Sequence, residues 1–292
     1  MDYEIKNGKL LKCKPSIPDQ VVESEGRRLR IATQELDLII PEGVISIDRK
    51  AFDQVSSYVE TILLPESLTS LEGFSFKSFI DLQKVVVAGN VKTIPNGLFT
   101  GNKTIKSVEL YHPINCISES AFSNCRSLEY FSFLDGLERI ERYAFYQCRK
   151  LKDFTFPSTI RYVGACAFCG ASSIRDVVFQ SSEGLYIGCG AFHENHRLRR
   201  IFIPEGVENL NHLAFSTSAK NIEVYLPSSV MRFEQEDDSK SGMMGGRFYG
   251  GLMSKWHDNR NNVSYPAITI IAPEDSFALK FAMKNSLPCK EE

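Results

Sequence analysis

The sequence lacks the segments that would place the chain in a membrane or mark it for export. No run of apolar residues approaches the roughly 18 that a membrane-spanning helix requires. The first residues, Met1-Asp2-Tyr3-Glu4, contain neither a basic stretch nor an apolar one. We therefore expect no signal peptide and no membrane insertion, and a chain with this sequence is expected in the cytoplasm.

An excess of charge of one sign is also missing. The 292 residues contain 34 basic and 36 acidic side chains, which gives a formal net charge of -2. This balance excludes bulk electrostatic attraction to nucleic acid or to an anionic membrane. Because 43% of the residues are hydrophobic, the chain can bury a substantial core. We expect a globular protein with no nucleic-acid partner.

Sequence motifs for catalysis and metal binding are absent as well. No Gly-x-Ser-x-Gly occurs, and no Gly-Lys-Ser/Thr follows the glycines around Gly245 and Gly250. His193 and His196 stand one residue closer together than the histidines of the His-Glu-x-x-His zinc motif. We expect no enzyme, no metal and no cofactor. An enzyme or metal-binding protein built on the His193/His196 loop, or on residues 234–266, is kept as an alternative.

What the sequence does contain is a repeat marked by phenylalanine. Eight marker phenylalanines recur every 23 or 24 residues, namely Phe52, Phe76, Phe99, Phe122, Phe145, Phe168, Phe192 and Phe215. Six of the eight directly follow an alanine, and an aliphatic residue stands five residues before each one. A fixed period of this length indicates a solenoid of stacked units.

Each repeat also contains a short segment whose alternation is typical of a β-strand, as in residues 131–133 and 177–179. A unit of about 23 residues cannot bury its apolar side alone, so we expect the strands to pair in parallel about 4.8 Å apart. Inward residues such as Phe133, Phe156 and Phe179 should then stack on one another. The pattern predicts a curved, β-rich solenoid with little helix.

The repeat resembles the BspA-like class of bacterial leucine-rich repeats. The family motif joins a strand, a proline, a turn, an aliphatic residue and an Ala-Phe pair followed by cysteine. In this sequence it is clearest in residues 128–148 and 151–168, and the resemblance covers about residues 36–233. It implies a leucine-rich repeat fold and a cell-surface or secreted bacterial protein that functions in adhesion.

We interpret residues 1–292 as one solenoid domain with a cap at each end. Residues 1–35 hold a hairpin around Asn7-Gly8, a sequence that favours a type I′ turn, and a polar connector. Residues 36–233 hold the repeats. Residues 234–266 form an irregular Gly-rich insertion, because the strand-like runs at Val224 and Ile268 are 44 residues apart, against an expected 23. Residues 267–292 hold the last strand and a cap helix that starts near Ser276.

The eight cysteines are an even number, which suggests disulfides if the protein is extracellular. However, Cys125 and Cys148 occupy the third position after a marker phenylalanine, where other repeats have Val55 or Ala171. A position that accepts such residues is a small buried site. The Cys-x-x-Cys of residues 166–169 encloses the Ala-Phe pair of its repeat, so we do not expect a zinc site. Buried thiols favour a reducing compartment.

The middle residue of each strand is expected to point away from the core, onto one open sheet face that ends near Thr269. The candidate binding residues there are Ile39, Leu63, Val86, Glu109, Tyr130, Val178, Arg200, Phe202 and Tyr225. Phe202 and Tyr225 beside Arg200 form the strongest group, since Tyr and Arg are frequent at binding hot spots. β-Propensity alone also favours apolar residues on a sheet face.

In the insertion, Trp256 is expected to wall one end of this face, with Phe248 and Tyr249 as further candidate binding residues. The predicted function is therefore noncatalytic binding of a protein or glycan partner, for adhesion or as a scaffold. An intracellular scaffold is the alternative if the protein is not exported.

Overall fold

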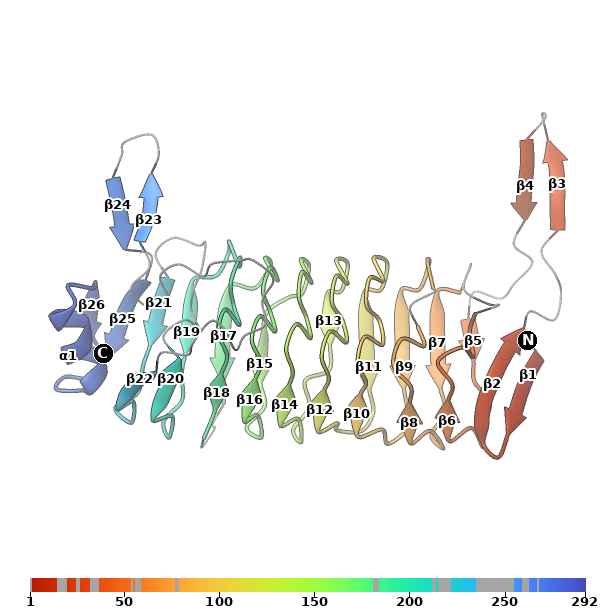
Figure 1. Cartoon of the computed structure of the whole chain (residues 1–292), viewed down its shortest axis with the longest axis horizontal. Coiled ribbons are helices and arrows are strands. Elements are labelled where there is room, and N and C mark those ends of the chain that lie inside the picture. Colours follow the sequence, from red (N-terminus) through yellow and green to blue (C-terminus); the bar gives the residue numbers. More distant parts are fainter. Residues whose placement is uncertain are drawn as a thin grey trace.

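The computed structural model is an elongated stack of coils (Figure 1). It describes residues 2–14, 20–24, 27–31, 37–53, 55, 59–76, 79–180, 184–211, 214, 222–234, 255–258, 263–266 and 268–292. Strands of successive coils lie side by side between an N-terminal hairpin and a C-terminal helix. The predicted parallel-strand solenoid is confirmed, and α1 (Phe277–Lys284) is the only helix among the described residues.

Each coil contributes one strand to a long parallel sheet, which is divided into two portions. The first portion contains β5 (Asp37–Ile39), β7 (Thr61–Leu64), β9 (Lys84–Val87), β11 (Ser107–Leu110) and β13 (Tyr130–Phe131). The second contains β15 (Phe154–Phe156), β17 (Asp176–Phe179), β19 (Arg200–Phe202), β21 (Ile222–Tyr225), β25 (Ile268–Ala272) and β26 (Cys289–Glu291). Residues one repeat apart face each other in register, such as Val85 and Val108.

A slip of aromatic side chains accompanies the division between β13 and β15. Phe133 stacks on Phe154, with ring centroids 4.0 Å apart, but is tilted against Phe156 at 6.2 Å. Phe156 does stack on Phe179, at 4.3 Å. The expected stack of these inward phenylalanines is therefore confirmed for Phe156 and Phe179. It is wrong for Phe133, whose ring stacks on Phe154, two residues before the expected partner Phe156.

A second parallel ladder of short strands forms another side of the stack. Its members are β6 (Ser46–Ile47), β8 (Ser70–Leu71), β10 (Thr93–Ile94), β12 (Cys116–Ile117), β14 (Arg139–Ile140), β16 (Tyr162–Val163), β18 (Tyr186–Ile187), β20 (Asn209–Asn211) and β22 (Arg232–Glu234). The aliphatic residue five positions before each marker phenylalanine lies in these strands and is buried. These residues form one wall of the core.

The marker phenylalanines form a continuous column through the core. Those from Phe52 to Phe192 are at most 1% exposed, and each stacks on the next. The six consecutive ring pairs have centroids 5.0–5.7 Å apart and interplanar angles of 22° or less. Phe215 lies outside the described residues. The column explains the strict period, because a ring displaced by one residue would leave the stack.

The corners that carry the marker phenylalanines from Phe99 to Phe192 are each built from two left-handed residues. One stands two positions before the phenylalanine and one stands two positions after it. Around Phe122 these are Ser120 and Asn124, with φ of 57° and 63°, and around Phe145 they are Tyr143 and Gln147, with φ of 58° and 57°. Backbone hydrogen bonds join the corners of neighbouring coils, such as the one from Phe122 N to the oxygen of the next corner alanine. The tight corner leaves room for alanine, and these alanines are buried.

The third position after the marker phenylalanine holds a buried hydrogen-bond donor in several coils. The Sγ atoms of Cys125 and Cys148 donate to the carbonyl oxygens of Phe99 and Phe122 in the preceding coils, at 3.2 and 3.1 Å. Asn195 Nδ2 makes the equivalent bond to Phe168, at 3.0 Å. All eight cysteines are described, and all are free thiols. The prediction of a small buried site at this position is confirmed.

The N-terminal cap is the predicted hairpin of β1 (Asp2–Lys6) and β2 (Lys9–Lys14). Asn7 and Gly8 have φ of 50° and 74°, as a type I′ turn requires. β2 then pairs in parallel with β6 and so joins the stack. The segment interpreted as a polar connector contains two further strands. β3 (Gln20–Ser24) and β4 (Arg27–Ile31) pair antiparallel there and form a second hairpin.

The C-terminal cap follows the prediction closely. Ser276 Oγ accepts a hydrogen bond from Leu279 N at 3.2 Å and so caps α1. Ala278, Leu279 and Ala282 are the buried residues of α1. The rings of Phe277 and Phe281 lie against Phe233.

The register across the insertion differs from the prediction. Ile222 of β21 pairs with Ile268 of β25, a spacing of 46 residues, which is two full periods. The expected 44 arose from aligning Val224 with Ile268. Within the intervening stretch, β23 (Lys255–Asp258) and β24 (Val263–Pro266) pair antiparallel. β25 therefore pairs directly with β21, although the chain between them is one repeat longer than between other neighbouring strands.

Candidate binding face

The outward row of the long sheet runs along its central strand positions. In the second portion, Thr155, Val178, Phe202 and Tyr225 lie in register on β15, β17, β19 and β21. Tyr225 pairs with Ile271 of β25. The row therefore passes through Ile271 and continues to Lys290 of β26. The prediction of Thr269 at this position was wrong, because it assumed a strand spacing of 44 residues in place of 46.

Val178, Phe202 and Tyr225 form what we call the aromatic patch. The rings of Phe202 and Tyr225 are stacked, with centroids 4.4 Å apart and an interplanar angle of 20°. All three side chains are half-buried. Because each is held by a paired strand with an apolar residue beneath it, the patch is a preformed surface.

Ion pairs line one side of the aromatic patch, where Asp176, Arg200 and Glu223 lie in register on β17, β19 and β21. Arg200 donates from Nε to Asp176, at 3.0 Å, and from its terminal nitrogen to the other oxygen of the same carboxylate. The Arg200 guanidinium also lies over the Phe202 ring, 5.8 Å from its centroid. The hydrogen bond with Asp176 raises the pKa of Arg200 above its usual value. Arg200 is thus held in one orientation beside the rings.

At the β21 end of this charged row, Tyr225 donates its hydroxyl to Glu223 at 3.2 Å, and Lys290 Nζ lies 3.1 Å from the same carboxylate. The hydrogen bond from Lys290 lowers the pKa of Glu223. Partial burial, with the charge of Glu223 nearby, raises the pKa of Tyr225. Tyr225 therefore stays neutral and keeps its donor proton at ordinary pH.

The N-terminal end of the row differs from the expectation in one residue. Ile39 is 60% exposed and Leu63 is half-buried, as expected for outward positions. Val86 was expected to be exposed as well, but only 7% of its surface is accessible. Its position in register between Leu63 and Glu109 explains this, because the larger neighbours flank a short side chain. The apolar patch at this end is smaller than predicted.

The middle of the row is polar, as expected. Glu109 pairs with Lys84 at 2.8 Å on the neighbouring strand. Tyr130 is 53% exposed at the start of β13.

Of the three candidate residues in the insertion, only Trp256 belongs to the described part of the chain. Trp256 lies in β23 and pairs with Tyr265 of β24, whereas Phe248 and Tyr249 lie outside the described residues.

Within the described part of the chain, no group of three or more His, Cys, Asp or Glu side chains is arranged to hold a metal ion. Glu194, which stands between His193 and His196, accepts a hydrogen bond from Gln147 Nε2 at 3.0 Å. The single described helix, α1, is too short to cross a membrane.

Comparison with known proteins identifies the family. The sequence matches the family described as BspA type Leucine rich repeat region (6 copies), over residues 33–151 and 115–237. The chain belongs to this family. The matched region covers more than half of the BspA-type chain, including both portions of the long sheet as far as β21. Comparison with curated proteins gives no match.

Several solved structures resemble this BspA-type chain at low identity. The T. pallidum leucine-rich repeat protein TpLRR is 23% identical, over 65% of this chain and 86% of that one, with a TM-score of 0.39. A leucine-rich cell surface protein from Faecalibacterium prausnitzii is 18% identical, over 80% and 91% of the two chains, with a TM-score of 0.33. A leucine-rich repeat protein from Bacteroides ovatus is 15% identical over the full length of both chains, with a TM-score of 0.25.

The BspA-type chain also has an outward row that the sequence interpretation missed, on the ladder of short strands. Arg139 lies over the ring of Tyr162, 4.2 Å from its centroid, and Tyr162 stacks on Tyr186 at 5.2 Å. Pairing of β14, β16 and β18 brings them together. The period could have revealed them, because each directly precedes the aliphatic residue of its repeat.

Proposed function

We propose that this BspA-type repeat protein is a noncatalytic binding protein that holds a protein or glycan partner on the outward face of its long sheet. The observation that carries the proposal is the aromatic patch, in which Phe202 and Tyr225 stack at 4.4 Å in a partly exposed position. Partly exposed aromatic residues framed by charged side chains are typical of binding hot spots.

The rigidity of the patch supports the same proposal. Phe202 and Tyr225 are fixed by their strands and by each other, and Arg200 is fixed by its bond to Asp176. Side chains that are already ordered lose little conformational entropy when a partner binds. The stacked strands therefore present a preorganised surface.

We place this binding in adhesion, and an intracellular scaffold is the alternative. The two are distinguished by digesting intact cells with a protease and detecting the protein by immunoblotting. Loss of the protein from intact cells supports adhesion. Full protection in intact cells, with digestion after lysis, contradicts adhesion and favours the scaffold.

The binding proposal is tested with purified protein on a panel of extracellular-matrix proteins and on a glycan array. The variants are the double substitution Phe202→Ala and Tyr225→Ala, and the control Tyr111→Ala, which removes a 65% exposed tyrosine outside the patch. We expect the wild type to bind at least one probe. The double variant should bind that probe at least about tenfold more weakly, because hot-spot aromatics carry much of the binding energy.

The control variant should retain the wild-type affinity. Binding that is unaffected by the double substitution contradicts the proposal, and so does a wild-type protein that binds no probe of either kind. A thermal unfolding curve of each variant shows whether a loss of binding reflects a loss of fold.

A further inference from the structure

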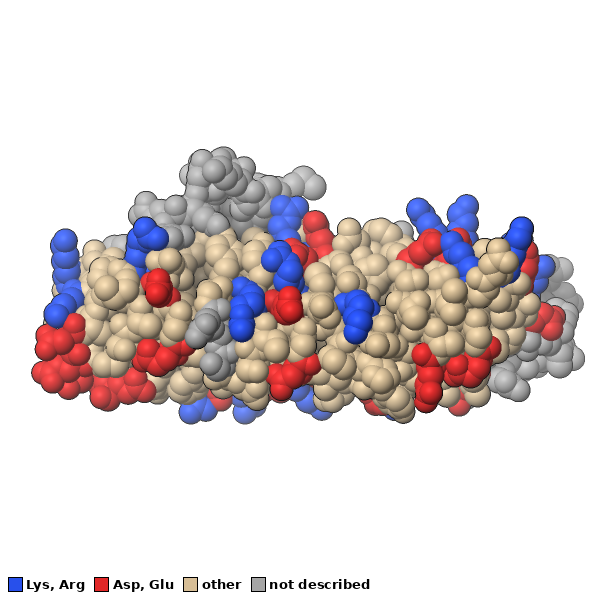
Figure 2. Space-filling view, turned by 90° about the horizontal axis from the view of Figure 1, so that it is seen from below, with Lys and Arg blue, Asp and Glu red and all other residues tan. Residues whose placement is uncertain are grey.

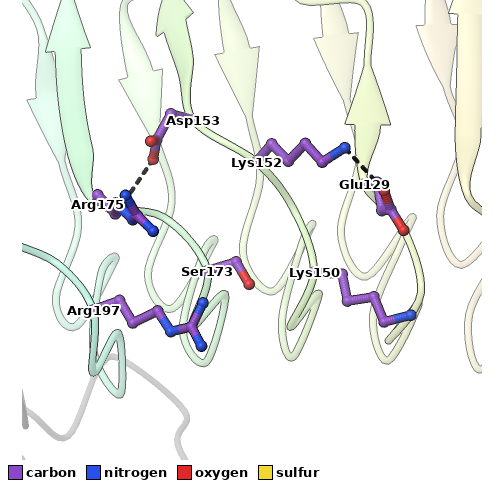
Figure 3. Close-up of a pocket in the computed structure, with 7 residues that line it drawn as sticks. All are labelled: Glu129, Lys150, Lys152, Asp153, Ser173, Arg175 and Arg197. Atoms are coloured by element: carbon purple, nitrogen blue, oxygen red, sulfur yellow. Dashed lines mark hydrogen bonds and ion pairs between the residues drawn. The ribbon is translucent and has the colours of Figure 1, made fainter.

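A groove of about 380 Å³ lies at the edge where the chain enters β15 and β17. Cationic side chains from three consecutive coils line it, namely Lys150 and Lys152, then Arg175, then Arg197. Figure 3 shows Arg175, Ser173 and Arg197 gathered on one side of the groove and the two lysines on the other. We call it the basic groove. It shares no residue with the aromatic patch.

The acidic residues of the basic groove are already engaged. Glu129 pairs with the ammonium group of Lys152 at 3.0 Å. The Asp153 carboxylate accepts hydrogen bonds from the backbone nitrogens of Arg175 and Asp176, at 2.6 and 3.4 Å. These contacts, two of them drawn in Figure 3, hold both carboxylates in place, and the groove keeps a positive net charge because four cationic side chains line it with two acidic ones.

Three cationic groups of the basic groove have no such partner. Among the residues that the structure describes, none forms an ion pair or side-chain hydrogen bond with Lys150, with the guanidinium of Arg175 or with Arg197. All three residues are exposed. A set of unpaired cations around one groove attracts anions, and the interaction strengthens where the walls exclude water.

A further arginine, Arg199, lies next to Arg175 on the adjacent coil. Arg199 N donates to the carbonyl oxygen of Arg175 at 2.7 Å, so these two arginines follow one another on adjacent coils. At the next position the corresponding pair is Asp176 and Arg200, which compensate each other's charge. Like charges opposite one another on a sheet are destabilising. An anion bound beside Arg175 and Arg199 would remove that repulsion.

We propose that the basic groove binds a polysaccharide that carries sulfate or carboxylate groups. Its cations, Lys150, Arg175 and Arg197, would bind the anionic groups through charge-assisted hydrogen bonds. The Ser173 hydroxyl and the carboxylate of Asp153 supply acceptors for sugar hydroxyls. A charged polysaccharide offers both kinds of group on one chain, and successive coils repeat the basic positions along its path.

The same features disfavour a nucleic acid. None of the described residues that line the basic groove is aromatic, whereas single-stranded nucleic acids are bound by stacking their bases on aromatic rings. Seen from below, the stack carries acidic side chains interspersed among the basic ones and no uniform basic field (Figure 2).

The test measures the affinity of the full chain for heparin and for polygalacturonate, with uncharged dextran, single-stranded DNA and duplex DNA as comparison probes. The groove variant combines Lys150→Ala, Arg175→Ala and Arg197→Ala. The control combines Lys6→Ala, Lys14→Ala and Lys50→Ala, and so removes the same charge far from the groove. The single substitution Arg197→Glu serves as a second variant with minimal effect on the fold.

We expect the wild type to bind one or both charged polysaccharides, with an affinity that falls as salt is added. The groove variant should bind at least about tenfold more weakly, because it loses three charge-assisted contacts. Arg197→Glu should weaken binding in the same direction, and the control should bind as the wild type does.

Three results would overturn the proposal. They are no binding to either charged polysaccharide, an equal loss in the control variant, and tighter binding to DNA than to the polysaccharides. The Phe202→Ala and Tyr225→Ala double variant is measured in parallel. It should keep its affinity for the charged polysaccharide, so a failure of the aromatic patch and a failure of the basic groove give different results.

Discussion

Phe202 and Tyr225 stack across β19 and β21, with ring centroids 4.4 Å apart, although neither ring belongs to the buried core. We expect this contact to be measurable in a double-mutant cycle of Phe202→Ala and Tyr225→Ala. Stacked aromatic pairs contribute about 0.5–1.5 kcal/mol beyond their buried area. Urea unfolding of the wild type, both single variants and the double variant measures the coupling, and a coupling near zero would show that the rings do not stack in solution.

The left-handed corners predict different costs for two glycine substitutions. Gly97 and Gly101 flank Phe99 and have φ of 60° and 79°. A Cβ on Gly97 would come within 2.2 Å of the Phe74 ring, whereas a Cβ on Gly101 meets nothing within 4 Å. Both Gly→Ala changes carry the backbone cost of about 1 kcal/mol, and Gly97→Ala adds the steric one.

We therefore expect Gly97→Ala to lower the free energy of unfolding by clearly more than Gly101→Ala. Thermal and urea unfolding of the two variants measure the difference. Equal destabilisation would contradict the steric contact between residue 97 and Phe74.

Two asparagines in the same repeat position should respond oppositely to replacement by cysteine. Asn195 is fully buried, and its Oδ1 has no hydrogen-bond partner among the described residues. Asn102 Oδ1, in contrast, accepts hydrogen bonds from the backbone nitrogens of Thr104 and Ile105, at 3.1 and 2.9 Å. A buried polar atom without a partner costs about 1–3 kcal/mol.

Asn195→Cys removes the unpaired oxygen and keeps a donor, as Cys148 does two coils earlier. We expect it to raise the free energy of unfolding by about 1 kcal/mol. Asn102→Cys should lower it, because two backbone nitrogens lose their acceptor. Urea unfolding of both variants checks the signs, and destabilisation by both substitutions would show that Asn195 is well satisfied.

The buried thiols predict a pH dependence of stability in the alkaline range. Burial raises the pKa of Cys13 from 9.0 to about 11. The folded state therefore holds this proton more tightly than the unfolded state does. The resulting stabilisation is complete below pH 9 and is lost as the pH rises from 9 towards 11.

Urea unfolding at pH 8 and at pH 10.5 measures this loss. The wild type should lose more stability between the two pH values than the variant Cys13→Ala does. Labelling with a thiol reagent at pH 8 should modify the half-buried Cys116 and Cys289 before the six buried cysteines. Rapid labelling of Cys13 at pH 8 would contradict its raised pKa.

The fold could be predicted from the sequence because each coil repeats the same physical solution. A marker phenylalanine such as Phe145 must stack on Phe122 and Phe168, so its position along the chain is fixed. The caps were also predictable, because Asn7-Gly8 and Ser276 act through their own backbone conformations. These features depend on local sequence or on a strict period.

The features that could not be predicted depend on which coil lies next to which. Val86 is buried by its neighbours on the adjacent strands, and its own sequence context gives no sign of this. The basic groove was missed for the same reason. Whether Lys152 or Arg175 is neutralised depends on the carboxylates of the neighbouring coil, and only the register reveals them.

The most direct test of the account maps the contact made by the aromatic patch. A photoreactive benzophenone amino acid is placed at position 202 in one preparation and at position 111 in another. Each is irradiated with the matrix protein or glycan that the wild type binds most tightly. The account predicts a crosslink from position 202 and none from position 111. A crosslink from position 111 alone, or from neither position while binding is retained, would show that the partner binds elsewhere on the solenoid.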